Sequence, residues 1–372
     1  MLAVVERILD GVAGPVVPMP GDDLRTCDML TASLRVGQEI DDDIAVVVPT
    51  SGTTGTPKGA MLSARALVAS ASATHDRLGG TGTWLLALPT YHIAGLQVLI
   101  RSALAGTVPV ELDVTYGFDP AGLTGAVAAM GSGRRYASLV AAQLAKCLPD
   151  RDALAALADL DAVLLGGGPA PARILEEAAA ADISVVRTYG MSETAGGCVY
   201  DGSPLDGVDV RVEDDGRIVL GGATLASGYR NPPDPDPFAE PGWFRTDDVG
   251  ALDDSGSLRV LGRADDAIST GGLTVLPQPV ESALATHPAI ADCAVFGVAD
   301  DRLGQRVVAA VVLRPGAAAP GLDELRTHVE ATLPRTAAPR ELHIVDEVPR
   351  RGIGKIDRQA LSDLDFMPFV FG

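Results

Sequence analysis

Cysteine is scarce in this chain of 372 residues, and positively charged residues are fewer than negatively charged ones. The four cysteines have neither the paired spacing of a metal site nor the density of a disulfide framework, so we expect free thiols at Cys27, Cys147, Cys198 and Cys293. Lysine and arginine number 29 against 49 aspartates and glutamates, which gives a net charge of −20. This acidity argues against nucleic acid as a partner, because such binding depends on cationic contacts with phosphates.

Long apolar runs are also missing. No stretch reaches the roughly 18 residues that a membrane helix needs, and no basic flank precedes the first apolar residues. We therefore expect no membrane insertion and a cytoplasmic location. With 47% hydrophobic residues, the chain is long enough for one large and one small domain.

The most informative segment is 49–59, which directly follows the apolar run 44–48. Its small residues let backbone N–H groups approach an anion, its hydroxyls donate hydrogen bonds, and its lysine adds a positive charge. We predict that it holds nucleotide phosphates through Thr50, Ser51, Gly52, Thr53, Thr54, Gly55 and Lys58. It is not a Walker A loop, because Lys58 is followed by Gly59 and the glycines Gly52 and Gly55 are too close together.

The apolar pattern predicts two kinds of architecture. Strand-like runs at 44–48, 84–88, 162–165 and 183–186 alternate with helix-like stretches at 63–78 and 171–181, which is typical of an α/β unit. Short strands and tight turns follow from about residue 213, with a loop at 231–237. After Asp265 the pattern changes to helices at 278–286 and 323–332 and strands at 292–298, 306–313 and 342–345.

We therefore expect a large N-terminal α/β domain over residues 1–264, made of a layered α/β subdomain and a smaller β-rich subdomain. A small, mobile α+β domain over residues 265–372 would follow.

Five motifs in order resemble those of the adenylate-forming superfamily, which includes acyl-CoA synthetases and adenylation domains. The resemblance covers residues 44–360, and its motifs are the loop at 49–59, Tyr189 to Thr194, Gly242 to Asp248, Leu261 to Asp266 and Gly352 to Arg358. One departure is Asp247, where the family usually has glycine. Another is the short N-terminal part, with only 48 residues before the loop, so the acyl pocket is either more open than usual or completed by a second subunit in a homodimer.

The resemblance implies roles for the residues around ATP. Glu193 would hold Mg²⁺, Thr194 would contact the α-phosphate, and Asp248 would accept the ribose hydroxyls with help from Arg263. Thr194 as a helix cap and Glu193 as a solvated carboxylate are the plainer alternatives. Adenine would lie against a backbone wall and an aromatic ring, formed by Gly167, Gly168, Pro169, Tyr189 and Gly190, although the glycines also suit a simple strand-ending turn.

The C-terminal motifs imply a moving lid. Lys355 would bridge the carboxylate and the α-phosphate during adenylation, and Asp265 would be the hinge about which the small domain then turns. Gly271 and Gly272 would line the path of the pantetheine arm of coenzyme A, or they form a purely structural turn.

The segment 88–101 resembles that of short o-succinylbenzoate-CoA ligases of menaquinone biosynthesis. In that interpretation His92 and Gly190 border the acid, and the guanidinium of Arg101 pairs with a second carboxylate of the substrate. The alternatives are a packed histidine and an arginine whose head group reaches the surface.

Three functions follow from this sequence. The favoured one is an AMP-forming acid:CoA ligase that uses ATP, Mg²⁺ and coenzyme A, acting on o-succinylbenzoate. The second is another aryl- or alkyl-CoA ligase, or an adenylation enzyme that loads a carrier protein. The third is a non-catalytic nucleotide-binding protein, against which the presence of both Lys355 and Glu193 argues.

Overall fold

The computed structural model describes residues 1–50, 57–351 and 355–363. Its largest sheet has seven strands in the order β4-β3-β5-β6-β7-β8-β9, and the pairs between β4 and β7 are parallel. Its strands are β3 (Thr83–Leu86), β4 (Val110–Glu111), β5 (Arg135–Val140), β6 (Ala162–Gly166), β7 (Val185–Met191), β8 (Gly196–Tyr200) and β9 (Ser203–Pro204). The strands β3, β5 and β6 are almost entirely buried, because helices cover both of their faces.

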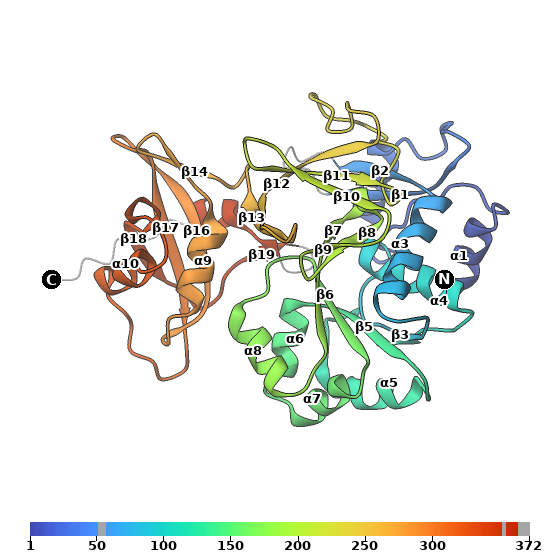
Figure 1. The fold of residues 1–372 in the computed structure, drawn as a ribbon, viewed down its shortest axis with the longest axis horizontal. Coiled ribbons are helices and arrows are strands. Elements are labelled where there is room, and N and C mark those ends of the chain that lie inside the picture. The colour runs from blue at the N-terminus through green and yellow to red at the C-terminus, as the bar shows by residue number, and fades with distance from the viewer. Residues whose placement is uncertain (51–56, 352–354, 364–372) are drawn as a thin grey trace.

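Alternate residues of the central strands belong to two separate cores. Trp84 packs with the helices α1 (Leu2–Leu9), α3 (Ala64–Arg77) and α4 (Ile93–Ala105), whereas the adjacent Leu85 packs with the opposite layer. That layer consists of α5 (Leu123–Ala129), α6 (Ala141–Cys147), α7 (Arg151–Ala158) and α8 (Ala172–Ala180), with the short turn η1 (Pro120–Gly122) before α5. Figure 1 shows these helices around the blue-to-green part of the ribbon. The helices predicted at 63–78 and 171–181 are confirmed as α3 and α8.

The strand predicted at 44–48 forms, but it lies outside the seven-stranded sheet. β1 (Ile44–Thr50) pairs antiparallel with β2 (Lys58–Ser63) to make a two-stranded sheet. One side of β1 packs into the main core through Val46 and Val48, and the other contacts α2 (Leu24–Ser33) through Ile44 and Val47. The pairing brings Thr50 opposite Lys58, so both ends of the predicted phosphate loop meet.

A four-stranded antiparallel sheet follows, as the change of pattern near residue 213 predicts. Its strands are β10 (Val208–Val212), β11 (Arg217–Gly222), β12 (Trp243–Leu252) and β13 (Leu258–Arg263). The register of β12 on β13 shifts between Val249 and Gly250, next to the pair of Asp248 with Arg263. The Pro-rich segment 231–237 contains no helix or strand, as expected.

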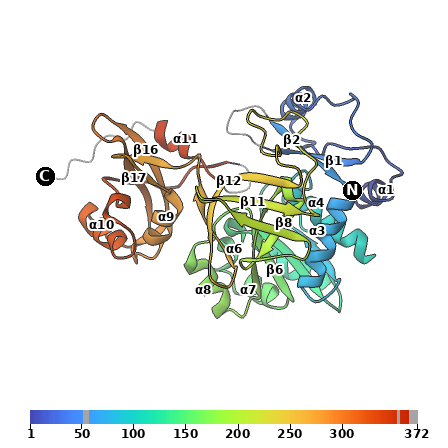
Figure 2. The same ribbon diagram turned by 45° about the horizontal axis from the view of Figure 1, so that its top comes forward.

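The chain then enters a separate mixed sheet, drawn in orange on one side of the molecule in Figures 1 and 2. Its five strands are β14 (Ile268–Thr270), β15 (Leu273–Val275), β16 (Ile290–Asp300), β17 (Gly304–Leu313) and β18 (Glu341–Ile344). It packs with α9 (Pro277–Ala285), α10 (Leu322–Glu330), η3 (Arg335–Ala337) and α11 (Arg358–Asp363) in its own two apolar clusters. A short antiparallel pair, β19 (Arg350–Arg351) with β20 (Lys355–Ile356), carries the predicted catalytic lysine.

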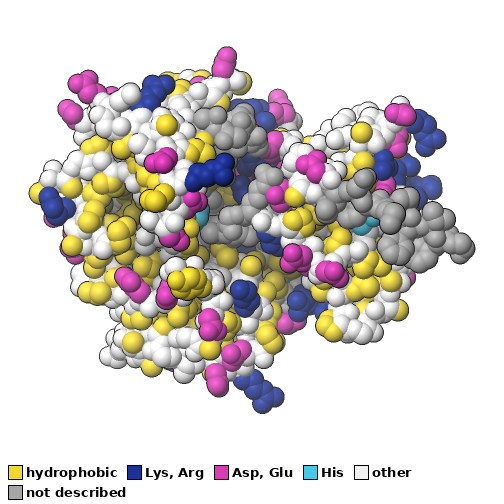
Figure 3. All heavy atoms as spheres, turned by 180° about the vertical axis from the view of Figure 1, so that it is seen from behind, with side chains coloured by type: hydrophobic (Ala, Val, Ile, Leu, Met, Phe, Trp, Pro, Cys, Tyr) yellow, Lys and Arg dark blue, Asp and Glu magenta, His cyan; other side chains and the backbone are white. Residues whose placement is uncertain are grey.

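One further expectation from composition is met. All four cysteines are free thiols. None of the helices described here combines the length and apolar character that a membrane crossing requires. On the face in Figure 3, acidic side chains are scattered over both parts of the molecule instead of forming a single patch.

Candidate functional site

The predicted phosphate loop is visible only at its two ends. Ser51, Gly52, Thr53, Thr54 and Gly55 lie outside the described residues, as do Gly352 to Gly354 and residues 364–372. Thr50 and Lys58 are described, and the Thr50 hydroxyl donates to the Lys58 carbonyl at 3.3 Å. This contact closes the base of the loop and leaves the Lys58 side chain half-buried at its edge.

Glu193 lies beside that edge, in the short 3₁₀ turn η2 (Ser192–Thr194) after β7. Its side chain is only 7% exposed, and one carboxylate oxygen accepts the Tyr229 hydroxyl at 2.5 Å. Burial raises the pKa of Glu193, whereas the Tyr229 hydrogen bond and the charges of Lys58 and Lys355 oppose this rise. A buried carboxylate whose ionised form is favoured by a tyrosine hydroxyl and by lysine charge suits a site for a cation and phosphates, and the alternative of a solvated carboxylate is wrong.

Thr194 is fully buried, and its hydroxyl is engaged with the backbone. The oxygen accepts from the Met191 N–H at 3.0 Å and the hydroxyl lies 2.7 Å from the Gly196 carbonyl, to which it donates. These bonds close η2 and so hold the neighbouring Glu193 in place. The described geometry therefore agrees with the capping role, and the contact with the α-phosphate stays a prediction.

The two adjacent aspartates of β12 face opposite sides, as strand geometry requires. Asp248 is 9% exposed and accepts the Tyr189 hydroxyl at 2.7 Å, whereas Asp247 lies outside and pairs with Arg217 at 2.9 Å. Burial raises the pKa of Asp248, and the Tyr189 bond together with the charges of Arg263 and Lys355 lowers it. Asp248 is thus the carboxylate that lies beside Tyr189, and the Asp247 substitution leaves it in position.

Arg263 connects this carboxylate to the predicted hinge. Its guanidinium donates two hydrogen bonds to Asp265, at 2.8 and 2.7 Å, and lies 3.6 Å from Asp248. Burial alone would lower the pKa of Arg263, but the bonds and charge of Asp265, with the other aspartates, raise it above its ordinary value. Asp265 itself lies in the segment between β13 and β14, where the chain passes from one sheet to the next.

The predicted adenine wall follows β6, which ends at Gly166. Gly167 has a φ of +82°, a turn conformation that favours glycine, while the space where a Cβ of Gly168 would lie is open. Gly190 has a different constraint, because a Cβ there would lie 2.1 Å from the Gly196 carbonyl oxygen. Close approach of β8 therefore explains Gly190, and the turn explains Gly167, without reference to a ligand.

The structure shows how deeply the two residues predicted to contact the substrate acid, His92 and Arg101, are buried. His92 precedes α4, is half-buried and packs on Tyr91 with ring centres 4.6 Å apart, and burial lowers the pKa of its imidazole. Arg101 is 4% exposed, so its head group does not reach the surface. The guanidinium stacks on Trp84, with its carbon 3.8 Å from the ring centre, and donates to the Gln97 carbonyl and the Ser138 hydroxyl.

Arg101 has no ion pair with any carboxylate in the part of the chain that the structure describes. Burial lowers its pKa to about 10. A buried guanidinium that lacks an anionic partner is costly, and it suits a site that receives an anionic ligand.

Lys355 lies in β20 of the C-terminal part, and its side chain is exposed. Burial is the main influence on the pKa of Glu193 and Asp248, which it raises, and the charge of Lys355 is among the groups that oppose this rise. The following Arg358 anchors this segment, because it donates to both oxygens of Glu281 on α9, at 2.8 and 3.0 Å. The bridging role of Lys355 stays a prediction.

The two glycines assigned to coenzyme A form the turn between β14 and β15. Gly271 and Gly272 have φ values of +59° and +79°, and the space where a Cβ of Gly272 would lie is open. The backbone conformation accounts for these glycines, and the pantetheine path stays a prediction.

Sequence reasoning missed Tyr229 and Asn231, which contact the predicted site from a segment without helix or strand. Tyr229 bonds Glu193, and the Asn231 amide bonds both the Pro57 carbonyl and the Gly59 N–H. The one sequence signal was an aromatic residue two positions before the Pro-rich segment 231–237 and an amide side chain at the first position of that segment.

Magnesium fits this arrangement. No cluster of three or more His, Cys, Asp or Glu side chains in the described ranges is able to hold a metal ion. Mg²⁺ needs no such cage, because it commonly binds one or two carboxylates together with substrate phosphates and waters. Glu193 as the carboxylate ligand stays a prediction.

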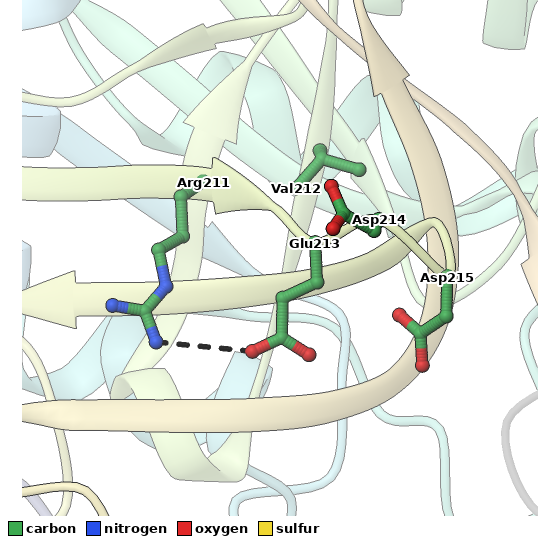
Figure 4. Close-up of a pocket in the computed structure, with 5 residues that line it drawn as sticks. All are labelled: Arg211, Val212, Glu213, Asp214 and Asp215. Atoms are coloured by element: carbon green, nitrogen blue, oxygen red, sulfur yellow. Dashed lines mark ion pairs between the residues drawn. The ribbon is translucent and has the colours of Figure 1, made fainter.

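The hollow drawn in Figure 4 is a different feature. It encloses about 530 Å³ and is lined by Arg211, Val212, Glu213, Asp214 and Asp215, which come from the end of β10 and the turn after it. The Arg211 guanidinium and the Glu213 carboxylate lie 3.8 Å apart across it. It contains none of the predicted site residues, and its three carboxylates do not suit a triphosphate.

Comparison with known proteins agrees with these features. Residues 21–230 match the AMP-binding enzyme family, and residues 279–355 match the AMP-binding enzyme C-terminal domain. The chain is 68% identical over 363 residues to "Probable 2-succinylbenzoate--CoA ligase" of Mycobacterium tuberculosis, covering 97% of this chain and 94% of the relative. It is 34% identical over 347 residues to "2-succinylbenzoate--CoA ligase" of Geobacillus sp., covering 87% of this chain and 69% of the relative.

A solved structure with the same fold is o-succinylbenzoate CoA synthetase from Bacillus subtilis in complex with the acyl-adenylate intermediate OSB-AMP. The TM-score is 0.76 at 27% identity, over 98% of this chain and 81% of that one. The same enzyme in complex with ATP and magnesium ion gives a TM-score of 0.75 at 28% identity, over 97% of this chain and 82% of that one.

Proposed function

We propose a ligase function from the premise that this chain belongs to the AMP-binding enzyme family. The chain joins o-succinylbenzoate to coenzyme A and converts ATP to AMP and diphosphate, a step of menaquinone biosynthesis, and it does so in the cytoplasm, where ATP and coenzyme A are supplied. The observation that carries this proposal is the buried Glu193 carboxylate, which accepts the Tyr229 hydroxyl at 2.5 Å, while the Lys58 ammonium lies 5.0 Å from the centre of the same tyrosine ring.

In the first step the substrate carboxylate attacks the α-phosphorus of ATP, and diphosphate leaves. The barrier comes from the crowding of negative charge, so catalysis depends on positioning and on cations. Lys58 binds the outer phosphates with the loop, and Lys355 neutralises charge between the carboxylate and the α-phosphate. Glu193 would hold Mg²⁺ together with phosphate oxygens, and the ion, when bound, would supply screening of the triphosphate charge.

The nucleotide is oriented from the opposite side. Asp248 accepts the ribose hydroxyls, and the Tyr189 ring lies against adenine beside the backbone of Gly167, Gly168 and Pro169. Arg263 is 3.6 Å from Asp248 and steers its carboxylate, which supports this assignment.

Arg101 gives the site its preference for a second carboxylate. Its guanidinium is buried and lacks an anionic partner in the described residues, and a dicarboxylate supplies that partner. An enzyme that activates amino acids would instead need an anion for the α-ammonium group, which has the opposite charge. His92 and Gly190 border the same substrate.

In the second step the thiol of coenzyme A attacks the acyl carbonyl, and AMP leaves. We assign residues 1–264 and 265–372 to two domains that turn about Asp265 between the steps, which withdraws Lys355. The separate apolar cores of the two parts support this division, because each part is able to keep its packing while it moves. The Gly271–Gly272 turn then borders the thiol's path.

The test is AMP release by the purified chain with ATP, Mg²⁺, coenzyme A and o-succinylbenzoate. We expect release to require both the acid and coenzyme A, and to fall strongly with a monocarboxylate of similar size. Release that needs a carrier protein in place of coenzyme A would identify a carrier-loading enzyme. Absence of acid-dependent exchange between diphosphate and ATP would refute catalysis altogether.

A further inference from the structure

Residues 226–231 run beside β2 and hold the exit of the phosphate loop. The backbone of Arg230 donates to the Gly59 carbonyl at 2.8 Å, and Met61 donates to the Gly228 carbonyl at 3.0 Å. Ser227 donates to the Met61 carbonyl at 2.8 Å, and Tyr229 forms an isolated bridge with Ala60. The segment therefore has a fixed register on β2, although it is not part of a regular sheet.

The Asn231 side chain holds the same region through two further hydrogen bonds. Its amide nitrogen donates to the Pro57 carbonyl at 2.7 Å, and its carbonyl oxygen accepts from the Gly59 N–H at 3.1 Å. These two bonds use the same donor and acceptor pattern as a peptide group. The side chain therefore links the backbone just before Lys58 to the backbone just after it.

Tyr229 lies in the middle of this segment and contacts two charged groups at once. Its hydroxyl donates to Glu193 at 2.5 Å, while the Lys58 ammonium lies 5.0 Å from the centre of its ring. The ring is 7% exposed and is held edge-on by Phe238, with ring centres 5.3 Å apart, and by Phe244. Both its polar tip and its aromatic face are therefore directed at the phosphate site.

We propose that Tyr229 is a positioning residue of the adenylation step, which orients the Glu193 carboxylate for the metal ion and the Lys58 ammonium for the outer phosphates. This inference rests on the proposed function. A glutamate side chain has several rotatable bonds, and a hydroxyl fixed by two phenylalanines and a braced backbone removes that freedom before the metal–nucleotide complex arrives. The segment also couples the two groups, since Ala226 donates to the Glu193 carbonyl while Arg230 holds Gly59.

A merely structural tyrosine would stabilise the fold without affecting the metal. The two roles are separated by the variant Tyr229→Phe, which removes one oxygen and keeps the ring contacts with Lys58, Phe238 and Phe244. The matched control is Tyr136→Phe, which removes another buried hydroxyl, one that donates to the Leu78 and Gly80 carbonyls and touches no predicted site residue.

The experiment measures Mn²⁺ bound to the full chain by paramagnetic resonance, in the presence of a non-hydrolysable ATP analogue. We expect Tyr229→Phe to weaken Mn²⁺ binding by about tenfold or more, the usual effect of losing a hydrogen bond to a charged group. Tyr136→Phe should titrate like the wild type. Diphosphate–ATP exchange by Tyr229→Phe should recover at high Mg²⁺, with the KM for the acid unchanged.

A double-mutant cycle completes the test. In the background of Glu193→Gln, Tyr229→Phe should cause little further loss, because both changes disrupt the same metal contact. A wild-type Mn²⁺ titration for Tyr229→Phe, or a full second loss in the Glu193→Gln background, overturns the inference. Failure of the wild type itself to bind the Mn²⁺–nucleotide complex would instead refute the proposed function.

Discussion

Replacing Arg101 with methionine should separate folding from specificity. In the folded chain the guanidinium is buried without an anionic partner, and burial lowers its pKa to about 10. At 1.36 kcal/mol per pKa unit, this corresponds to roughly 3 kcal/mol of unfavourable desolvation. Methionine removes that cost, but it also removes the stacking on Trp84, worth about 1 to 2 kcal/mol, and two hydrogen bonds, each worth about 1 kcal/mol.

These contributions nearly cancel. We therefore expect Arg101→Met to change the free energy of unfolding by less than about 2 kcal/mol, measured by urea denaturation. A buried arginine with a carboxylate partner would behave differently, because removing one member of such a pair costs about 3 to 5 kcal/mol.

Activity should respond much more strongly. Truncation of one partner of a buried charge pair costs about 2 to 5 kcal/mol in binding, so kcat/KM for o-succinylbenzoate should fall on the order of 30-fold or more. Arg101→Lys should restore only part of this loss, because an ammonium does not reproduce the fork of a guanidinium. The KM for ATP and the rate with a monocarboxylate of similar size should change little.

The assay is diphosphate–ATP exchange with each acid in turn, beside the unfolding measurement. An equal loss with the dicarboxylate and the monocarboxylate would refute the reasoning and make Arg101 a structural residue. A large loss of stability would also refute it, since that result would mean that the charge already has a partner in the free enzyme.

Three other predictions follow from the site and its surroundings. Lys355→Ala should reduce adenylation by several orders of magnitude, yet a supplied acyl adenylate should still react with coenzyme A at nearly the wild-type rate; equal loss in both half-reactions would contradict the proposed turning of the lid. Asp248→Asn should raise the KM for ATP by about tenfold or more, since it removes a charged acceptor, whereas Asp247→Gly should change this KM less than about threefold, because it breaks an exposed pair with Arg217 and a 3.6 Å contact with Arg263, which keeps its two bonds to Asp265; matching effects of the two variants would show that the opposite orientation of their side chains does not matter for the nucleotide. His75 is buried, accepts the Trp84 indole N–H, and has its pKa lowered from 6.5 to about 4, by burial first and then by the charge of Arg101. The unfolded chain therefore binds this proton at a higher pH than the folded chain does, so stability falls as the pH drops from about 6.5 to 4, by about 2 kcal/mol at pH 5. His75→Gln keeps an acceptor for Trp84 and should remove this part of the acid sensitivity; parallel stability curves for variant and wild type would refute the assignment.

The local pattern of the sequence predicts those elements whose signals act over a few residues, such as α3, α8, α9 and α10. Ser63 caps α3 by accepting the Ala66 N–H, and the apolar runs 84–88 and 162–165 correspond to β3 and β6 of a sheet covered on both faces. The strand β5 and the helices α5, α6 and α7 were not predicted. No such short-range signal shows which sheet a strand will join. The apolar run at 44–48 resembles the other strands, yet β1 joins β2 because the chain returns directly after the phosphate loop.

The residues of the candidate site likewise fall into two groups: those that a local motif predicts and those that only tertiary packing brings together. Motif spacing predicts Lys58, Glu193 and Asp248, since each lies within a short characteristic string. The contact of Tyr229 with Glu193 joins residues 36 positions apart. The burial of Arg101 on α4 depends on Trp84 from β3 and Ser138 from β5. Contacts of this kind become visible only when the elements are packed together.

The alternation of side chains along β12 decides which aspartate lies inside. Asp247 and Asp248 are chemically identical, and only odd or even position along the strand decides which of them lies beside Tyr189. The even positions Phe244, Thr246, Asp248 and Gly250 are all buried, and a Cβ at Gly250 would lie 2.8 Å from Ile218 and 2.9 Å from the Arg259 carbonyl. A slip of the strand by one residue would therefore exchange the two acids without changing the composition of the predicted site.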